Sequence, residues 1–298
     1  MEGWMNRCTL CPRRCGADRT VSVGRCGVGE QVRLARAALH FWEEPCVSGE
    51  EGSGTVFFSG CSLGCVFCQN YQISAGHFGR DIPVERLAEI FLELQEQKAN
   101  NINLVTGGHY IPQIVRALDL VRGKLHIPVV YNSSGYETVE ALRMLKGYVD
   151  VYLPDLKYRS PERGARYSHA PDYFAVASKA ILEMLDQVGP VRFDGRGMIQ
   201  RGLIVRHMVM PNGVEDSMDI LTWIADNLPL DDILVSVMSQ YTPFYRSGEY
   251  PEINRRLTAR EYDRVLDWLD CMGIENGFVQ ELSSAKEEYT PDFSLQGV

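Results

Sequence analysis

The sequence predicts an α/β protein, a partial (β/α)6 TIM-like barrel with a small N-terminal Cys-rich metal-binding segment. Between residues 55 and 280, short apolar runs alternate about six times with longer amphipathic segments. This alternation is typical of a parallel sheet whose strands are joined by crossover helices. Polar or glycine-bearing residues follow most of the apolar runs. In a parallel barrel, the loops that follow the strands share the rim that carries the site.

An open doubly wound sheet is the competing architecture. It usually carries a phosphate loop or a G-x-G-x-x-G motif after its first strand. Neither motif occurs in this sequence, so a barrel, complete or partial, is preferred.

The predicted strands are short runs rich in β-branched and aromatic residues, as in TVFFS at 55–59 and IPVVY at 127–131. We expect the other strands at 101–105, 149–153, 203–210 and 233–238, with a short partial strand at 277–280. The predicted helices place apolar residues on one face, and the helix at 83–98 also has a proline in its first turn. We expect the other helices around 111–122, 137–146, 171–187, 216–227 and 258–271.

Residues 1–50 differ from the rest of the chain because they lack convincing strand or helix periodicity and are rich in Cys, Arg and Gly. We expect them to form a small metal-stabilised segment, joined to the barrel through the flexible stretch SGEEGSG at 48–54. The barrel is expected to occupy residues 51–282, followed by a C-terminal tail at 283–298.

The composition argues against two classes of partner. The 298 residues carry a formal charge of −9 and no basic stripe, so no nucleic-acid partner is expected. The longest apolar runs, such as 55–58 and 202–210, are too short to span a bilayer, so no membrane partner is expected. The N-terminus lacks the apolar core of a secretory signal, and we expect a cytoplasmic protein.

The cysteines are the most informative residues. Reducing compartments keep thiols free, so the nine cysteines of a cytoplasmic chain are not expected to form a disulfide framework. Seven of them fall into two tight groups, and clustered thiols usually mean a metal site. The other two, Cys46 and Cys271, are expected to be small buried hydrophobes or inert thiols rather than ligands.

Cys61, Cys65 and Cys68 follow the first predicted barrel strand in the spacing C-x3-C-x2-C. Four thiolates would complete an iron–sulfur cluster, so three leave one iron with a vacant position for an external ligand. A redox pair of Cys65 and Cys68 would leave Cys61 unexplained, and no thioredoxin-like context surrounds it. A zinc site completed by a nearby histidine such as His77 is the remaining alternative.

This spacing, with Phe67 directly before the last thiol, closely resembles the signature of the radical S-adenosylmethionine (SAM) superfamily. The resemblance implies that Cys61, Cys65 and Cys68 hold a [4Fe–4S] cluster, and that SAM chelates the fourth iron through its amino and carboxylate groups. Reduction of the cluster then cleaves SAM to methionine and a 5′-deoxyadenosyl radical. Residues 55 to about 245 and the N-terminal CTLCPRRCGADR look like an uncharacterised branch related to pyruvate formate-lyase activating enzymes.

The resemblance also implies SAM-binding residues. Phe67 is placed against the adenine, and Gly107 and Gly108 match the glycine-rich loop that receives the methionine amino group. His109 stands where Glu is common in the family, so its role is open between a site residue and a loop histidine without a ligand role. Asn132 and Ser134, which follow the third predicted strand, are candidates to hydrogen-bond the ribose or the carboxylate.

Asp155 and Lys157 resemble the Asp-x-Lys of activating enzymes, and the two charges can pair with opposite ends of the amino acid moiety. A simple salt bridge at the rim is the alternative. Arg206 and His207 are adjacent in a strand, so at most one of them faces the barrel interior. The resemblance places Gln240, with its neighbour Tyr241, near the adenine or the substrate.

The N-terminal group consists of Cys8, Cys11, Cys15 and Cys26, which are enough ligands to close a site. Both a second [4Fe–4S] cluster and a Cys₄ zinc site fit this set. Zinc ribbons usually show two Cys-x2-Cys pairs and only one occurs here, which slightly favours iron–sulfur. Glu43 and Glu44, just before the predicted linker, are expected to form a solvated acidic turn rather than to reach the rim.

The expected function is that of a radical SAM enzyme, with oxidoreductase or lyase chemistry like that of activating enzymes. A low-potential electron donor, a flavodoxin or ferredoxin, would reduce the cluster, and the radical would abstract hydrogen from an unidentified substrate. That substrate is expected to be a glycyl radical partner protein, and a small molecule or a peptide is the alternative. A non-catalytic zinc-binding module is the hypothesis from a different class.

Overall fold

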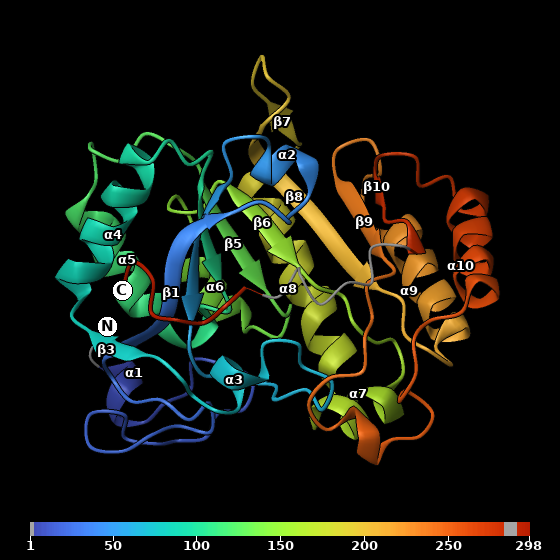
Figure 1. Cartoon of the computed structure of the whole chain (residues 1–298), viewed down its shortest axis with the longest axis horizontal. Helices are drawn as coiled ribbons and strands as arrows, with labels where there is room; N and C mark the ends of the chain where they lie inside the picture. The colour runs from blue at the N-terminus through green and yellow to red at the C-terminus, as the bar shows by residue number, and fades with distance from the viewer. Residues whose placement is uncertain (1–2, 283–290) are drawn as a thin grey trace.

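The computed structural model of the protein describes residues 3–282 and 291–298. Its centre is a ten-stranded sheet in the order β10-β9-β8-β6-β5-β4-β2-β1-β3, with β7 (Arg192–Phe193) paired to β8 (Figure 1). The parallel strands are β2 (Ser53–Phe58), β4 (Ile102–Val105), β5 (Val129–Ser133), β6 (Val151–Pro154), β8 (Ile199–Met208), β9 (Leu234–Met238) and β10 (Gly277–Val279). The sheet is open, because no ladder joins β10 to β3 within the described residues.

Amphipathic helices connect the parallel strands and cover the outside of the sheet. They are α4 (Val84–Glu96), α5 (Ile111–Leu120), α6 (Val139–Met144), α8 (Tyr173–Val188), α9 (Val214–Asn227) and α10 (Ala259–Cys271). On α4, for example, Leu87, Ile90, Phe91 and Leu94 are buried. The predicted fold class, a partial parallel α/β barrel, is therefore confirmed.

Local capping explains where some of these helices begin. Thr258 and Glu261 form a capping box at the start of α10, in which each side chain accepts from the backbone amide of the other residue. Thr138 accepts a hydrogen bond from the amide of Ala141 at the start of α6. The loop between β6 and α8 contains a further helix, α7 (Pro161–Ser168), which was not predicted and which begins at the capping residue Ser160.

Residues 1–50, in which the sequence shows no convincing strand or helix periodicity, nevertheless contain a strand of the main sheet. β1 (Val32–His40) is a nine-residue strand that pairs antiparallel with β2 and with β3 (Arg80–Ile82). Its sequence VRLARAALH combines small and charged residues, which weakens the usual strand signal. α1 (Gly3–Asn6) and α2 (Pro45–Ser48) are the short helices of the same segment. Part of this segment therefore belongs to the main sheet, while the domain boundaries at 50 and 282 remain predictions.

The stretch at 48–54 is not a free linker. Asn100 Nδ2 donates to the carbonyl of Ser48 at 2.7 Å, and Ser53 Oγ donates to Asn101 Oδ1 at 2.6 Å. The backbone of Gly54 also bonds to Asn101, so this turn is attached to the residues that precede β4.

The predicted C-terminal tail falls partly outside the described residues, at 283–290. Residues 291–298 lie along β1, where the amide of Leu295 donates to Ala35 and the amide of Ala37 donates to Gln296. The ring of Phe293 packs edge-on against Phe57 at 5.5 Å between centroids. The tail thus covers part of the β1–β2 end of the sheet.

In Figure 1 the carboxyl ends of the parallel strands point to the lower half of the view, where α1, α3 (Tyr71–Ser74) and α7 lie. α2 lies at the opposite end of the strands. Within residues 3–282 and 291–298, no helix combines the length and the apolar composition needed to cross a lipid bilayer.

Candidate active site

A single cavity collects most of the predicted site residues at the carboxyl ends of the parallel strands. Its walls come from the cysteine loop after β2, from the ends of β5, β6, β8 and β9, and from Pro291 of the tail. The predicted residues that line it are Cys61, Cys65, Phe67, Cys68, Asn132, Ser134, Asp155, Lys157, Arg206 and Gln240. The structure therefore brings together side chains that are up to 179 positions apart in the sequence (Gln240 minus Cys61).

The cysteine loop is held by its backbone rather than by regular structure. The amide of Val66 donates to Tyr167 at 2.9 Å, and the carbonyl of Val66 accepts from Arg246 at 2.8 Å. Gly60 reverses the chain after β2 with φ of 88°, a conformation that favours glycine. These contacts leave all three thiols of the loop on the cavity wall.

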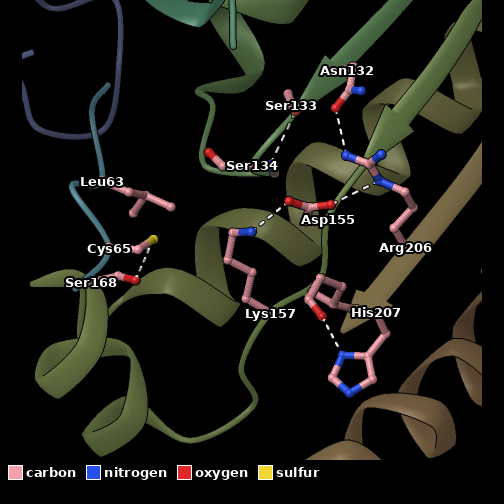
Figure 2. Close-up of polar contacts among 12 residues, drawn as sticks. Leu63, Cys65, Asn132, Ser133, Ser134, Asp155, Lys157, Ser168, Arg206 and His207 are labelled. Carbon is pink, nitrogen blue, oxygen red and sulfur yellow. Dashed lines mark hydrogen bonds and ion pairs between the residues drawn. The ribbon is translucent and has the colours of Figure 1, made fainter. Parts of the chain in front are cut away.

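Each thiol of this loop receives a hydrogen bond. Ser168 Oγ, at the end of α7, donates to Cys65 Sγ at 2.9 Å (Figure 2), and Ser74 Oγ donates to Cys68 Sγ at 3.2 Å. The amide of Leu63 donates to Cys61 Sγ at 3.4 Å. Burial raises the pKa of Cys65, which Lys157 opposes, and burial raises the pKa of Cys68 to about 12. A metal centre among the sulfurs would stabilise the thiolates further, because a bound cation favours deprotonated thiols.

Phe67 is buried in an aromatic corner of the cavity. Its ring lies 5.8 Å from that of Tyr241 and 6.4 Å from that of Tyr158, between centroids. Tyr241 is itself fixed, because its hydroxyl donates to the carbonyl of Ile253 at 2.8 Å. A rigid apolar wall of this kind suits a planar aromatic group.

A charged network occupies the wall opposite the thiols (Figure 2). Asp155 accepts from Lys157 Nζ at 2.6 Å and from Arg206 Nε at 3.0 Å, and Arg206 Nη2 donates to Asn132 Oδ1 at 2.6 Å. Burial alone would raise the pKa of Asp155, but Lys157 and Arg206 outweigh it and the pKa is lowered. The pKa of Lys157 is raised, because Asp155 outweighs the opposite effect of burial. All three groups are therefore charged at neutral pH.

Glu43 belongs to this network, so the prediction of a solvated acidic turn is wrong. Its carboxylate accepts from Arg206 Nη1 at 3.1 Å, from Asn103 Nδ2 at 3.1 Å and from Asn132 Nδ2 at 3.2 Å. The neighbouring Glu44 is also buried, and its Oε2 has no hydrogen-bond partner. Burial raises the pKa of both carboxyl groups, and Arg206 opposes this.

The glycine-rich stretch after β4 lies behind the cavity wall. Thr106 lines the cavity, whereas Gly107 and Gly108 do not. Thr106 has φ of 59°, which is strained for a β-branched residue and marks this turn as a constrained one. A Cβ atom on Gly108 would lie 3.0 Å from Glu137 Oε1, and one on Gly107 would lie 2.7 Å from Ile114 Cδ1. A side chain at either position would therefore displace the end of a neighbouring side chain.

Both histidines beside predicted site residues point away from the cavity. His109 is buried, and burial lowers its pKa to about 3, so the neutral ring donates from Nε2 to the carbonyl of Ser59 at 2.8 Å. His207 lies between the carbonyl of Leu156 and Ser217 Oγ (Figure 2 shows the first contact), while Arg206 faces the cavity. The expectation that only one of Arg206 and His207 faces the interior is confirmed.

The four N-terminal cysteines lie outside the cavity, against the back of the cysteine loop. The amide of Cys61 donates to the carbonyl of Cys26 at 3.3 Å. Burial raises the pKa of Cys11 to about 11. The pKa of Cys15 is lowered, because backbone amides including those of Arg25 and Ala17 outweigh the effect of burial. Of the two isolated cysteines, Cys46 is buried as predicted, with a pKa raised by burial to about 12, whereas Cys271 is exposed.

The cavity fits a [4Fe–4S] cluster with an open iron and a bound SAM. The described lining includes three cysteine sulfurs and no fourth, which leaves one iron for an external ligand. The Asp155–Lys157 pair offers one anion and one cation for the amino acid group of SAM, and Phe67 offers an apolar face for its adenine. His77, the candidate fourth zinc ligand, does not line the cavity, and its ring packs against Gly27.

The comparisons with known proteins define the family. The sequence profile of the radical SAM superfamily matches residues 55–224. The chain is also 36% identical over 277 residues to uncharacterized protein MJ0674 from Methanocaldococcus jannaschii, a match that covers 90% of this chain and 75% of that protein. The chain belongs to the radical SAM superfamily, and it is therefore an enzyme whose cofactors are a [4Fe–4S] cluster and SAM. The family predicted from the cysteine loop is confirmed.

Solved structures with a similar fold share little sequence. The chain aligns with Streptococcus suis SuiB bound to precursor peptide SuiA at 13% identity and a TM-score of 0.50, over 76% of this chain and 48% of that one. It aligns with the FeFe-hydrogenase maturase HydG from Carboxydothermus hydrogenoformans at 12% identity and a TM-score of 0.51, over 79% and 56%. The chain thus spans about half the length of these proteins, and the likeness shows the common fold.

Several residues of the site carry no sequence signal of their own. Ser168 and Glu137 are ordinary residues in the sequence, and only folding brings Ser168 to Cys65 and Glu137 to the glycine loop. Thr106, directly before Gly107, and Ser74, six positions after Cys68, lie close to their partners already in the sequence. The apolar residues Phe41 and Trp42 before Glu43 are no sign that the acidic pair is buried, because both rings are themselves exposed.

Proposed function

We propose that the protein cleaves SAM reductively and uses the resulting 5′-deoxyadenosyl radical to abstract hydrogen from a substrate held in the same cavity. The observation that carries this is the position of Cys61, Cys65 and Cys68 on one wall of the cavity, opposite the Asp155–Lys157–Arg206 network. When bound, the cluster supplies the electron that breaks the carbon–sulfur bond of SAM. The protein holds the amino acid group of SAM, covers its adenine and excludes water.

Different residues of the cavity bind different parts of SAM. Lys157 and Asp155 present opposite charges to the amino and carboxylate groups of SAM, and Phe67 contacts its adenine. Asn132 and Ser134 are placed to hydrogen-bond the ribose or the carboxylate, and Gln240 borders the adenine or the substrate. Gly107 and Gly108 follow Thr106 in the turn after β4, and the backbone of this turn, which reaches the cavity at Thr106, receives the methionine amino group.

The substrate occupies the part of the cavity that the cluster and SAM leave free. Lining residues not assigned to the cluster or to SAM include Trp42, Met208, Met238 and Pro291, together with the carboxylate of Glu43. A peptide segment carrying a glycine of a glycyl radical partner protein suits such a mixed apolar and charged wall, and a small molecule or another peptide is the alternative. SuiB, which shares the fold, is described with a bound precursor peptide. A flavodoxin or ferredoxin in the cytoplasm supplies the electron, and the N-terminal cysteines bind a second centre, iron–sulfur or zinc.

The test is analysis of products under anaerobic conditions. The purified protein, reconstituted with iron and sulfide and reduced with dithionite, is incubated with SAM, and the products are separated by chromatography. We expect 5′-deoxyadenosine and methionine in equal amounts from the wild-type protein, none from Cys65→Ala, and full activity from the matched control Cys271→Ala. Cleavage of a different carbon–sulfur bond, or product from Cys65→Ala, would contradict the proposal.

The substrate is then sought by isotope transfer. Extract from cells grown in deuterated medium is added to the reaction, and the mass of the 5′-deoxyadenosine is measured. A fraction of the extract that raises this mass by one deuterium contains the hydrogen donor. Digestion of the fraction with a protease before the assay separates a protein substrate from a small molecule.

A further inference from the structure

The surface of the N-terminal segment carries a group of unpaired cations. Arg7, Arg14 and Arg25 are exposed, and within residues 3–282 and 291–298 none of their side chains forms an ion pair, a hydrogen bond or a ring contact. By contrast, the exposed Arg246 is paired with Glu249 at 2.6 Å. The chain as a whole has a formal charge of −9, so three free cations in one short segment stand out against an acidic protein.

The backbones that carry these arginines meet at one exposed sulfur. Arg14 directly precedes Cys15, which is exposed, and the backbone amide of Arg25 donates a hydrogen bond to the Cys15 thiol. Arg7 directly precedes Cys8, whose carbonyl accepts from the amide that follows Cys15 at 2.9 Å. The three cations therefore extend from neighbouring positions on one face of the segment.

Two exposed apolar side chains adjoin the cations. Val21 and Val23 are 82% and 61% exposed, the two highest values among the exposed large hydrophobic residues that the structure describes. Their turn runs past the same sulfur, since a Cβ atom on Gly24 would lie 3.6 Å from Cys15 Sγ. Apolar side chains beside unpaired cations suit a surface that an acidic protein covers. We refer to Arg7, Arg14, Val21, Val23 and Arg25 as the arginine patch.

The arginine patch lies behind the cysteine loop and not over the cavity. Cys26, which directly follows Arg25, accepts a hydrogen bond from the amide of Cys61 at 3.3 Å, and Arg13 Nε donates to the carbonyl of Ser62 at 2.8 Å. The described lining of the cavity includes no residue of the patch. A protein bound to the patch would therefore adjoin the cysteine loop from behind and leave the cavity free for the substrate.

We propose that the arginine patch is the docking surface for an acidic one-electron carrier protein, which reduces the cluster at Cys61, Cys65 and Cys68. This rests on the proposed function, in which such a carrier supplies the electron, and it adds where the carrier binds. The carrier is oxidised by one electron and the cluster is reduced by one, with no bond formed or broken. Flavodoxins and ferredoxins, the carriers of this class, have acidic surfaces that complement the unpaired arginines.

The docking surface is tested by binding. Calorimetric titration measures the affinity of the full-length protein for an acidic flavodoxin, under anaerobic conditions, in about 20 mM and about 300 mM salt. We expect Arg14→Glu and Arg25→Glu each to weaken binding by about tenfold at low salt, and by less at high salt. The matched control is Arg192→Glu, because Arg192 is exposed and lies in β7, at the opposite end of the strands from α1 (Figure 1).

Three results would overturn the docking surface. These are no binding of flavodoxin by the wild-type protein, equal losses of affinity in Arg192→Glu and the two patch variants, and tighter binding of a DNA duplex than of flavodoxin. Because binding is measured directly, each result is obtained whether or not the protein cleaves SAM.

Electron transfer gives a second readout. The rate at which the visible absorbance of the cluster bleaches is measured with reduced flavodoxin and, separately, with dithionite. We expect Arg14→Glu and Arg25→Glu to slow reduction by flavodoxin and to leave reduction by dithionite unchanged, because a small donor needs no docking surface. Equal slowing with both donors would mean that the arginines support the metal centre, and would overturn the proposal. SAM cleavage driven by dithionite in the same variants tests the proposed function separately.

Discussion

Arg206 Nε lies 3.0 Å from one carboxylate oxygen of Asp155, and Lys157 Nζ lies 2.6 Å from the other. One buried anion therefore bridges two buried cations. The backbone supports this arrangement, because Asp155 and Arg206 also form an isolated parallel β-bridge at the ends of β6 and β8. The bridge holds Lys157 at the cavity wall, where the amino acid group of SAM is expected to bind.

Asp155→Asn is expected to weaken both the fold and the binding of SAM. The amide cannot balance two buried cations, and breaking a buried ion pair from one side costs about 3–5 kcal/mol of unfolding free energy. Denaturant unfolding and equilibrium dialysis with SAM measure the two effects. The matched control is Asp81→Asn, which breaks the half-exposed Arg33–Asp81 pair and should cost about 1 kcal/mol or less without changing SAM binding. Equal losses in the two variants would contradict the prediction.

Removing the serine hydroxyls beside the thiols should change the potential of the first cluster. Ser168 Oγ accepts from Tyr158, and its own proton is then directed to Cys65 Sγ. Hydrogen bonds to cysteine sulfur stabilise the more negative, reduced cluster. Ser168→Ala and Ser74→Ala are therefore expected to shift the midpoint potential to more negative values while SAM affinity stays unchanged. Redox titration checks this, with Ser247→Ala as a control, because that hydroxyl donates to the carbonyl of Phe244.

His109 is predicted to be structural. Its neutral ring satisfies the carbonyl of Ser59, and its own carbonyl accepts from Arg19. His109→Leu leaves the Ser59 carbonyl without its donor and should cost about 1–3 kcal/mol of unfolding free energy. His109→Gln retains an N–H donor and should cost less. SAM affinity, measured for both variants, is expected to stay within twofold of the wild type. A large loss of affinity in His109→Gln would assign the ring a direct role.

Glu137 should make stability depend on pH. Burial raises the pKa of this carboxyl to about 7 from its ordinary 4.5 in the unfolded chain, and the hydrogen bond from Ser133 opposes the shift. Between these two values, the folded state holds a proton that the unfolded state has released. The free energy of unfolding therefore falls as pH rises from about 4.5 to about 7, by at most about 3 kcal/mol.

Glu137→Gln isolates this effect. The amide is neutral at every pH, so the variant should lose this part of the pH dependence and become more stable relative to the wild type as pH rises. Thermal unfolding of the anaerobic protein, followed from about pH 5 to about pH 8, measures the difference. A wild-type-minus-variant difference that stays constant over this range would refute the prediction.

The alternation of apolar runs and amphipathic segments was sufficient to predict the parallel strands and their helices. The strand at 127–131 and the helix at 83–98 are read from neighbouring residues alone, because burial on both faces of a parallel sheet requires continuous apolar runs and burial of one helix face requires a period of 3.6. The C-x3-C-x2-C spacing predicted an open metal site for the same reason, because three thiols in one short loop can surround one cluster without help from distant residues. The family followed from the resemblance of this spacing to a known signature. The Cys8–Cys26 group was likewise visible in the sequence.

The tertiary structure decided which strands pair and which side chains contact the residues of the site. β1 was missed because a strand of small and charged residues is stabilised by its pairing with β2 and β3, and no local pattern reports that pairing. Glu43 forms an ion pair with Arg206 and is not a solvated turn residue. These two residues are 163 positions apart, so their contact depends on the path of the chain after β1. The position of Arg19 near Cys26 and the hydrogen bond from Ser168 to Cys65 also depend on the folded chain and not on the local sequence. A site confined to one loop can be predicted from the local sequence. Charge balance and hydrogen bonding between loops cannot, because they form only once the chain has folded.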